Sequence, residues 1–191
     1  MQAILGIGNL GSRYRLNRHN AGFLLLDQFA DGSGVNFKSS HGNYFLAEGT
    51  FYGSKFSLIK PANYVNNSGI AAKEVVEHYN IELENLLVIC DDVNLDFGEL
   101  RIRKSGEDGG HNGLRSIIYH LNSNKFPRLR IGVRNKENQI DLVEFVLSDF
   151  TKEEILTLKE IFNTASSLLS EFIRGGIKGM LEANSKLRKN K

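Results

Sequence analysis

The hydrophobic pattern of the chain changes period repeatedly, and this alternation limits the folds that the chain can adopt. Short apolar runs typical of buried strands, at residues 2–7 and 86–90, are separated by segments with apolar residues at helical spacing, at 20–30 and 68–79. Strands that alternate with helices in this way favour a sheet covered by helices on both faces. The sequence therefore predicts an α/β protein with a single three-layer domain, in which helices flank a twisted mixed β-sheet.

Turn signals and shorter periodic segments fill the intervals between these elements. Gly53 and Ser54 lie between two alternating segments, 44–52 and 55–59, and this arrangement predicts a β-hairpin. Ser68, at the start of the second helical segment, is typical of a helix N-cap. Three further elements are predicted: a strand at 99–103, a helix at 113–121 and a strand at 129–133.

The C-terminal part of the chain predicts one long helix with a break. Thr151 and Glu154 match the capping box that opens many helices, and the Gly-Gly pair at 175–176 predicts where the helix is interrupted. A basic helix or tail follows at about 177–191, and no Pro- or Ser-rich linker divides the sequence. Because 191 residues are an ordinary size for one domain, we expect a single domain over 1–191.

Composition excludes several classes of protein. The chain is 41% hydrophobic and 24% charged, as in ordinary globular proteins, and its longest apolar runs, such as 23–26, are too short to cross a bilayer. The N-terminal residues lack the basic and apolar regions of a secretion signal. A single cysteine, Cys90, cannot form an internal disulfide, which favours a reducing compartment. We therefore expect a cytoplasmic protein that does not engage a membrane.

Positive charge is concentrated in three segments. Residues 1–20 carry a net charge of +3, residues 98–136 carry +6 and residues 178–191 carry +4, although the whole chain carries only +2. Such segregation suggests a surface that faces a polyanion, of which nucleic acid is the first candidate. The alternative is that these charges are scattered over the surface and never converge, and the sequence leaves both possibilities open.

The segment 6–11 spells the G-x-G-x-x-G motif directly after a predicted strand. In a dinucleotide-binding fold the third glycine opens a helix, and an acidic residue ends the next strand roughly 20 residues later. Here the helical segment begins only near Asn20, and Asp27 and Asp31 lie in or just after that helix. The dinucleotide interpretation is therefore disfavoured. The segment is still a turn that places polar groups at the carboxyl end of a strand, where α/β sheets build their sites.

Asp91 and Asp92 follow another predicted strand directly. Carboxylates at a strand end can hold a hard metal ion for phosphoryl chemistry. The sequence contains no H-x-x-x-H or paired-cysteine spacing that would support a transition metal, and adjacent acidic residues are more often solvated or capping groups. We expect no metal and no cofactor. Metal-dependent phosphoryl or nucleotide chemistry remains an alternative that a chelator would test.

Two histidines occupy loops rich in small residues, each before a predicted helix. His19 is followed by Asn-Ala-Gly, and His111 lies between a Gly-Gly pair and Asn-Gly. Small residues around a polar pair let a ligand approach the backbone closely. A lone histidine in such a loop is more often structural. Two such loops, together with Asp91 and an asparagine-rich stretch at 63–67, indicate a candidate site.

Four segments, at 6–11, 18–22, 60–69 and 109–114, closely resemble the motifs of the bacterial peptidyl-tRNA hydrolases and occur in the same order and spacing. The similarity extends over essentially the whole chain, through 145–147. The resemblance implies an enzyme that hydrolyses the ester between a peptide and the 3′-terminal ribose of tRNA, and so frees tRNA from prematurely dissociated peptidyl-tRNA. It also implies a cytoplasmic monomer that needs no metal or cofactor. The partner that it implies is peptidyl-tRNA, which the protein contacts at the acceptor stem and the 3′ end of the tRNA.

The resemblance also assigns roles to individual residues. His19 matches the family's general base, which takes a proton from the attacking water, and Asp91 matches the carboxylate that orients this histidine. Asn9 matches the residue that helps to distinguish an N-blocked substrate from free aminoacyl-tRNA. The other matches are binding positions: Asn66, Asn112, Tyr14 and Tyr64 for the peptide and the tRNA end, and Arg103 and Arg130 for tRNA phosphate.

Several positions depart from the family's usual pattern without touching the His19–Asp91 pair. They are Leu10 in place of proline, Val65 in place of methionine, Asn94 in place of aspartate, and Glu107-Asp108 in place of small residues. The two adjacent acids either repel RNA or pair with Arg103 and Lys104, and the sequence leaves both possibilities open.

A relative that binds RNA but has lost hydrolysis is the competing hypothesis, since such proteins occur among plastid splicing factors similar to this family. The residues that match the catalytic set discriminate between the two hypotheses. Asn9, His19, Asn66, Asp91 and Asn112 are all present, which favours the enzyme.

Overall fold

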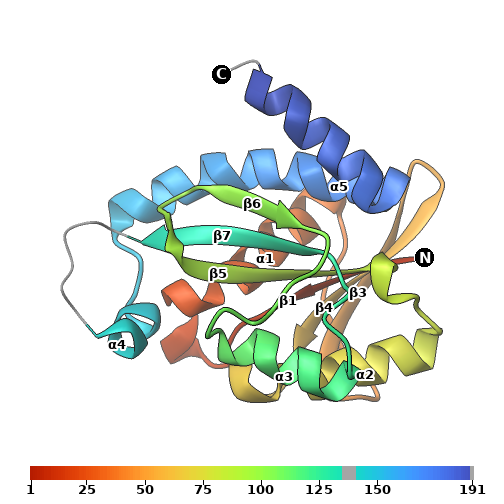
Figure 1. Ribbon diagram of the computed structural model, residues 1–191, viewed down its shortest axis with the longest axis horizontal. Coiled ribbons are helices and arrows are strands. Elements are labelled where there is room, and N and C mark those ends of the chain that lie inside the picture. Colours follow the sequence, from red (N-terminus) through yellow and green to blue (C-terminus); the bar gives the residue numbers. More distant parts are fainter. Residues whose placement is uncertain (135–140, 190–191) are drawn as a thin grey trace.

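The computed structural model of the protein describes residues 1–134 and 141–189. Within these residues, seven strands form one sheet in the order β2-β3-β4-β1-β5-β7-β6 (Figure 1). The four central strands run parallel to one another: β4 (Ser54–Pro61), β1 (Gln2–Gly6), β5 (Leu86–Asp96) and β7 (Arg128–Arg134). The outer strands are antiparallel to their neighbours: β2 (Lys38–Ser39), β3 (Tyr44–Phe51) and β6 (Leu100–Arg103). The predicted mixed sheet is confirmed.

Helices cover both faces of this sheet (Figure 1). On one face lie α1 (Ala21–Ser33) and α5 (Lys152–Lys189), and on the other lie α2 (Ser68–Tyr79) and α3 (Asn112–Leu121). Shorter elements join them: η1 (Ser12–Tyr14), η2 (Arg18–Asn20), η3 (Val65–Asn67), η4 (Leu83–Asn85) and α4 (Leu142–Leu147). The predicted three-layer α/β fold is therefore confirmed.

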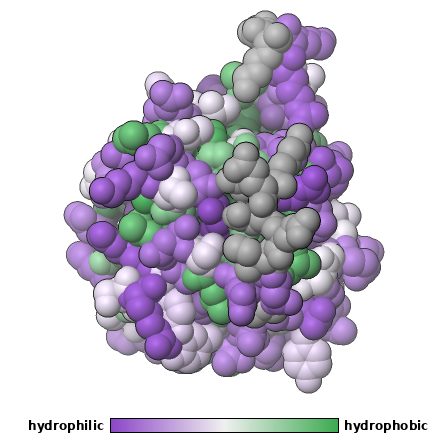
Figure 2. All heavy atoms as spheres, turned by 90° about the vertical axis from the view of Figure 1, so that its left-hand side faces the viewer, coloured by the Kyte–Doolittle hydropathy of each residue, from purple (hydrophilic) through white to green (hydrophobic). Residues whose placement is uncertain are grey.

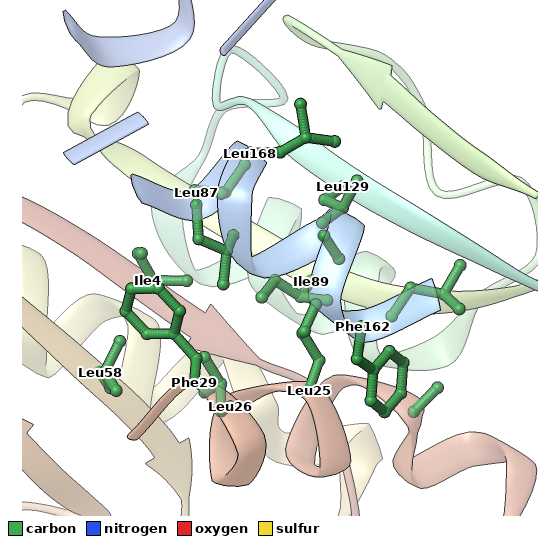
Figure 3. Packing of buried hydrophobic residues seen from close by; sticks show 14 of the residues in the cluster. Ile4, Leu25, Leu26, Phe29, Leu58, Leu87, Ile89, Leu129, Phe162 and Leu168 are labelled. Atoms are coloured by element: carbon green, nitrogen blue, oxygen red, sulfur yellow. The ribbon is translucent and has the colours of Figure 1, made fainter. Parts of the chain in front are cut away.

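The core is divided into two hydrophobic clusters, one on each face of the sheet. Because successive side chains of a strand point to opposite faces, Ile4 and Leu58 pack beneath α1 and α5, whereas Leu5 and Ile59 pack beneath α2 and α3. Figure 3 shows the first cluster, in which side chains of α1 and α5 meet those of the strands. The labelled contributors from the helices are Leu25, Leu26, Phe29, Phe162 and Leu168.

Two predictions about the last helix hold in detail. The N–H of Thr151 donates to Oε2 of Glu154 (2.8 Å), and the N–H of Glu154 donates to Oγ1 of Thr151 (3.2 Å), so the capping box is confirmed. At 175–176 the backbone leaves the helical conformation, with Gly176 at a φ of 60°. The helix therefore kinks there and continues in a new direction to Lys189 (Figure 1). Among the described helices, none is long and apolar enough to span a membrane.

Two other local predictions are wrong. Ser68 does not cap α2, because the chain enters this helix through η3 and leaves Asn67 in the N-cap position. The hydroxyl of Ser68 instead donates to the carbonyl of Val65 (2.8 Å). Strand β5 does not end at residue 90, because Asp91 and Asp92 continue its pairing with β7 and are buried. The backbone of these two residues therefore belongs to the sheet, and their side chains are buried instead of being solvated on a loop.

Candidate active site

The carboxyl ends of the parallel strands open into a cleft of about 520 Å³. Crevices at this edge are where α/β sheets usually bind their ligands. Figure 2 faces this edge of the molecule and shows apolar and hydrophilic residues side by side on it. The polar lining includes Asn9, His19, Asn66, Asp91, His111, Asn112 and Arg130, and α4 contributes the apolar side chains of Leu142, Val146 and Leu147.

A glycine at the start of α1 brings the predicted catalytic residues together. A Cβ at Gly22 would lie 2.7 Å from the carbonyl oxygens of both Ile7 and Ile89, so only glycine lets the first turn of α1 contact β1 and β5. His19 lies in η2, just before this turn, and Asp91 lies two residues after Ile89 on β5. The close packing of helix and strands therefore places His19 beside Asp91.

His19 and Asp91 form a short, buried contact. Nδ1 of His19 lies 2.8 Å from Oδ1 of Asp91, and the two side chains are 13% and 2% exposed. Because a carboxylate only accepts hydrogen bonds, Nδ1 of His19 carries a proton. In the neutral ring, Nε2 is then the unprotonated nitrogen. The pair thus holds His19 in the tautomer that a general base requires.

Burial and charge act in opposite directions on the pKa values of this pair. Burial lowers the pKa of His19, but the charge and hydrogen bond of Asp91 raise it, and the net pKa lies above the ordinary value for histidine. Burial raises the pKa of Asp91, but His19 and His111 together hold it well below its usual range. Asp91 is therefore a carboxylate at neutral pH, and His19 can hold a proton that it has just accepted.

A second histidine reaches the same carboxylate oxygen. Nε2 of His111 lies 3.0 Å from Oδ1 of Asp91, while its Nδ1 accepts the N–H groups of Gly113 (3.1 Å) and Leu114 (3.3 Å) at the start of α3. A nitrogen that accepts two N–H groups carries no proton, so the proton of the neutral ring is on Nε2 and is donated to Asp91. The glycine-flanked loop indicates that His111 lies near the site. The sequence does not indicate that His111 joins the carboxylate of Asp91 to the first turn of α3.

The same geometry bears on metal binding. His19, Asp91 and His111 offer three potential ligand atoms within 4.8 Å of one another. Coordination through Nε2 of His111 would leave that ring with no proton, because its Nδ1 already accepts two backbone N–H groups. The hydrogen bonds of the cluster therefore favour a carboxylate that accepts from two imidazoles over a metal site.

The backbone N–H, the backbone carbonyl and the side-chain oxygen of Asn9 all form hydrogen bonds within the protein. Its N–H donates to Oδ1 of Asn20 (2.7 Å), and Nδ2 of Asn20 donates back to its carbonyl (2.9 Å). Its side-chain Oδ1 accepts the N–H of Val65 (2.9 Å). Because a backbone N–H can only donate, the amide is oriented with its Nδ2 group as the donor left for the cleft. Asn20 follows His19 directly, but the resemblance assigns no role to it.

The other predicted binding residues of the peptide and the tRNA end lie around the rim. Tyr64 is 61% exposed and meets the ring of Tyr14 edge-on, with 6.4 Å between the ring centroids. Asn66, on η3, is an exposed residue of the cleft wall. Asn112 is the first residue of α3 and is also exposed, and its Oδ1 accepts a hydrogen bond from Arg115 (3.2 Å). The structure therefore brings Tyr64, Asn66 and Asn112 to the cleft, with Tyr14 beside them.

The two predicted phosphate contacts lie in different surroundings. Arg130, on β7, lines the cleft, and its Nε lies 2.9 Å from Oδ2 of the buried Asp92. Arg103 lies on the edge strand β6 and is exposed. Its partner across the ladder is the buried Arg128. The structure thus brings Arg130 into the cleft and leaves Arg103 on the outer edge of the sheet.

The adjacent acids that depart from the family pattern brace the loop before α3. Oδ1 of Asp108 accepts the N–H of Gly110 (2.7 Å), and Oε1 of Glu107 accepts a hydrogen bond from the side chain of Asn124 (2.7 Å). Asp108 also pairs with Arg115 (3.6 Å), and within the described residues neither acid forms an ion pair with Arg103 or Lys104. Of the two possibilities left open by the sequence, pairing with Arg103 and Lys104 is therefore not seen.

Comparisons with known proteins show to which family the chain is similar. The family model described as peptidyl-tRNA hydrolase matches residues 3–191. A peptidyl-tRNA hydrolase of Thermoanaerobacter pseudethanolicus is 44% identical over 177 residues, which cover 93% of this chain and 95% of that protein. One from Lachnospira eligens is 40% identical over 185 residues, which cover 96% of this chain and 100% of that protein.

A solved structure gives the same result. The crystal structure of peptidyl-tRNA hydrolase from Acinetobacter baumannii matches with a TM-score of 0.88 at 31% identity, over 96% of this chain and 94% of that one. The resemblance carried by the four motifs is thus confirmed over nearly the whole sequence. The chain belongs to the peptidyl-tRNA hydrolase family.

Proposed function

We propose that this chain hydrolyses the ester between a peptide, or an N-blocked amino acid, and the 3′-terminal ribose of tRNA, with His19 as the general base and Asp91 as the group that orients it. The observation that carries the proposal is the 2.8 Å contact between Nδ1 of His19 and Oδ1 of Asp91 at the cleft. This contact leaves Nε2 of His19 free to accept a proton from water.

The reaction proceeds through a tetrahedral intermediate. Water, hydrogen-bonded to Nε2 of His19, attacks the ester carbonyl carbon and gives its proton to that nitrogen, while the carbonyl electrons move to oxygen. Asp91 stabilises the resulting imidazolium. The intermediate then expels the ribose oxygen, which takes the proton back from Nε2. General base catalysis of this kind contributes roughly 10²–10⁴-fold in rate.

The amide of Asn9 supports both this step and the choice of substrate. Its Nδ2 group is a hydrogen-bond donor toward the cleft, because Oδ1 is engaged by Val65. Such a donor stabilises a developing oxyanion or binds the carbonyl of a blocked amino group. A free α-ammonium group would meet a donor where it needs an acceptor and would lose hydration. Free aminoacyl-tRNA is therefore a poor substrate.

The RNA part of the substrate is assigned to the cationic residues around the cleft. Arg130 within the cleft and Arg103 on the sheet edge bind phosphates of the acceptor stem and 3′ end. The residues that bind the terminal nucleotides and the peptide are Tyr14, Tyr64, Asn66 and Asn112. Since one chain supplies all of these residues, we expect a monomer to be active. Peptidyl-tRNA arises in the cytoplasm, where we place the protein.

The experiment that tests this function compares two tRNA substrates in the presence of EDTA. One is N-acetyl-aminoacyl-tRNA, and the other is the same tRNA with the amino acid unblocked. We expect rapid release from the blocked substrate alone. Equal release from both would contradict the role of Asn9, and loss of activity with EDTA would indicate metal-dependent chemistry. No release despite tRNA binding would indicate the RNA-binding alternative.

A further inference from the structure

The residue before the proposed base is an arginine that does not line the cleft. Arg18 is 3% exposed, and its guanidinium carbon lies over the rings of Phe145 and Phe150, at 4.7 and 5.0 Å from their centroids. Its NH1 and NH2 donate to the two carboxylate oxygens of Glu154, at 2.9 and 2.8 Å. This bidentate contact joins the turn that carries His19 to the first turn of α5, 136 residues later.

The carboxylate of Glu154 has two tasks at once. Its Oε2 also accepts the N–H of Thr151 and thereby caps α5. The orientation of this side chain is therefore set by the helix before Arg18 binds to it. Because a capped helix end is a rigid support, Glu154 can fix the position of the guanidinium, and the planar guanidinium in turn fixes η2.

The neighbouring backbone extends this connection to the wall of the cleft. The N–H of Arg18 donates to the carbonyl of Ser148 (3.0 Å), Nδ2 of Asn17 donates to the carbonyl of Leu147 (2.6 Å), and the N–H of Phe150 donates to the carbonyl of Leu16 (2.9 Å). Leu147 belongs to α4 and lines the cleft. These hydrogen bonds join residues 16–18 to residues 147–150, and so they fix the position of His19 relative to the apolar wall of the cleft.

From this arrangement we infer that Arg18 and Glu154 are positioning residues, which hold His19 at its working distance from Asp91 and from the α4 wall of the cleft. The inference rests on the proposed role of His19. Stability alone does not account for the pair, because apolar side chains of similar volume often replace a buried ion pair without loss of stability. Geometry does account for it, since a displacement of about 1 Å at a reacting group can lower the rate about 10²-fold.

The test is Arg18→Lys, which keeps the positive charge but has no planar guanidinium to bind both oxygens of Glu154 and stack on aromatic rings. We expect kcat to fall between about 10-fold and 10²-fold with KM nearly unchanged. We also expect the acidic limb of the kcat/KM profile to move to lower pH, because a loosened contact with Asp91 raises the pKa of His19 less. Glu154→Gln keeps an acceptor for Thr151 and should give a smaller change of the same kind.

Asp27→Asn is the matched control. This substitution removes the carboxylate partner of Lys60, which is a largely buried cation like Arg18. Neither Asp27 nor Lys60 lines the cleft. The control should keep the kcat and the pH profile of the unchanged chain. A normal kcat and profile in Arg18→Lys, or an equal loss of kcat in the control, would overturn the inference.

His19→Ala separates this inference from the proposed function. If His19→Ala is inactive while Arg18→Lys has normal kinetics and only a lower melting temperature, the positioning role alone is overturned. If His19→Ala keeps its activity, the assignment of the base is wrong and the positioning role falls with it. A characteristic low-field NMR signal of the Nδ1 proton of His19, shifted in Arg18→Lys but not in Asp27→Asn, would support the inference directly.

Discussion

The inner part of the cleft and its rim are held in different ways. The inner part consists of Asn9, His19 and Asp91, which are buried or nearly so and are fixed by hydrogen bonds from several elements. The rim residues Asn66 and Asn112 are exposed, and Tyr64 is 61% exposed. A group that moves a proton needs a fixed geometry, whereas groups that bind varied peptides and RNA can adjust to each substrate. Changes in the inner part should therefore lower kcat, and changes at the rim should raise KM.

The largest effect is expected from His19→Ala, which removes the base from the inner part. We expect kcat to fall by roughly 10²–10⁴-fold. The affinity for tRNA should change little, because His19 is only 13% exposed and is not among the residues assigned to tRNA phosphate. Steady-state kinetics with N-acetyl-aminoacyl-tRNA and a separate tRNA-binding titration check both statements.

The control for this prediction is His78→Ala, which removes an exposed histidine at the end of α2 that does not line the cleft. It should keep the kcat of the unchanged protein. Near-normal turnover in His19→Ala would remove the distinction between the two regions, because the inner part would then contain no base.

A smaller effect of a different kind is expected from Asn66→Ala and Asn112→Ala at the rim. Each removes a hydrogen-bonding amide, which should raise KM by roughly 2- to 10-fold and leave kcat nearly unchanged. Asn112→Ala should not unfold α3, because His111 rather than Asn112 provides its N-cap. Steady-state kinetics over a range of substrate concentrations measure kcat and KM separately. A loss confined to kcat would contradict the prediction and would show that these residues act in catalysis, like those of the inner part.

The smallest effect is expected from Arg103→Gln on the edge strand. At a single salt concentration the loss of affinity should be modest, but the slope of log affinity against log salt should become less steep by about 1. Arg174→Gln, which removes a cation paired with Glu171 on α5, is the matched control and should leave the slope nearly unchanged. An unchanged slope in Arg103→Gln would show that Arg103 lies outside the RNA surface.

Local patterns in the sequence predict much of the fold but little of the site. The alternation of strand and helix periods depends on near neighbours and gives the three layers correctly. Ser68 shows the limit of such reasoning, because its preference for an N-cap is overridden by the 3₁₀ turn through which the chain enters α2. Strand β5 is longer than predicted for a related reason, since pairing with β7 buries two carboxylates that look like loop residues.

The contacts of the site join residues that are far apart in the sequence. His19 and Asp91 are separated by 72 residues, and only the resemblance to a family connects them before the structure does. The tautomer of His111 and the pairing of Arg18 with Glu154 depend on three-dimensional neighbours, so no local pattern reveals them. The catalytic roles of these residues stay predictions, whereas their contacts are observed.

The role of the His19–Asp91 pair is tested most directly by the pH dependence of kcat/KM for the unchanged protein and for Asp91→Asn. In the unchanged protein, kcat/KM should rise as His19 loses its proton and should level off above the raised pKa of that residue. In Asp91→Asn the plateau should fall about 10²-fold or more. Its midpoint should move to lower pH, because burial still lowers the pKa of His19 and no carboxylate raises it. A variant with the same plateau and the same midpoint would contradict the claim that Asp91 holds His19 as the base.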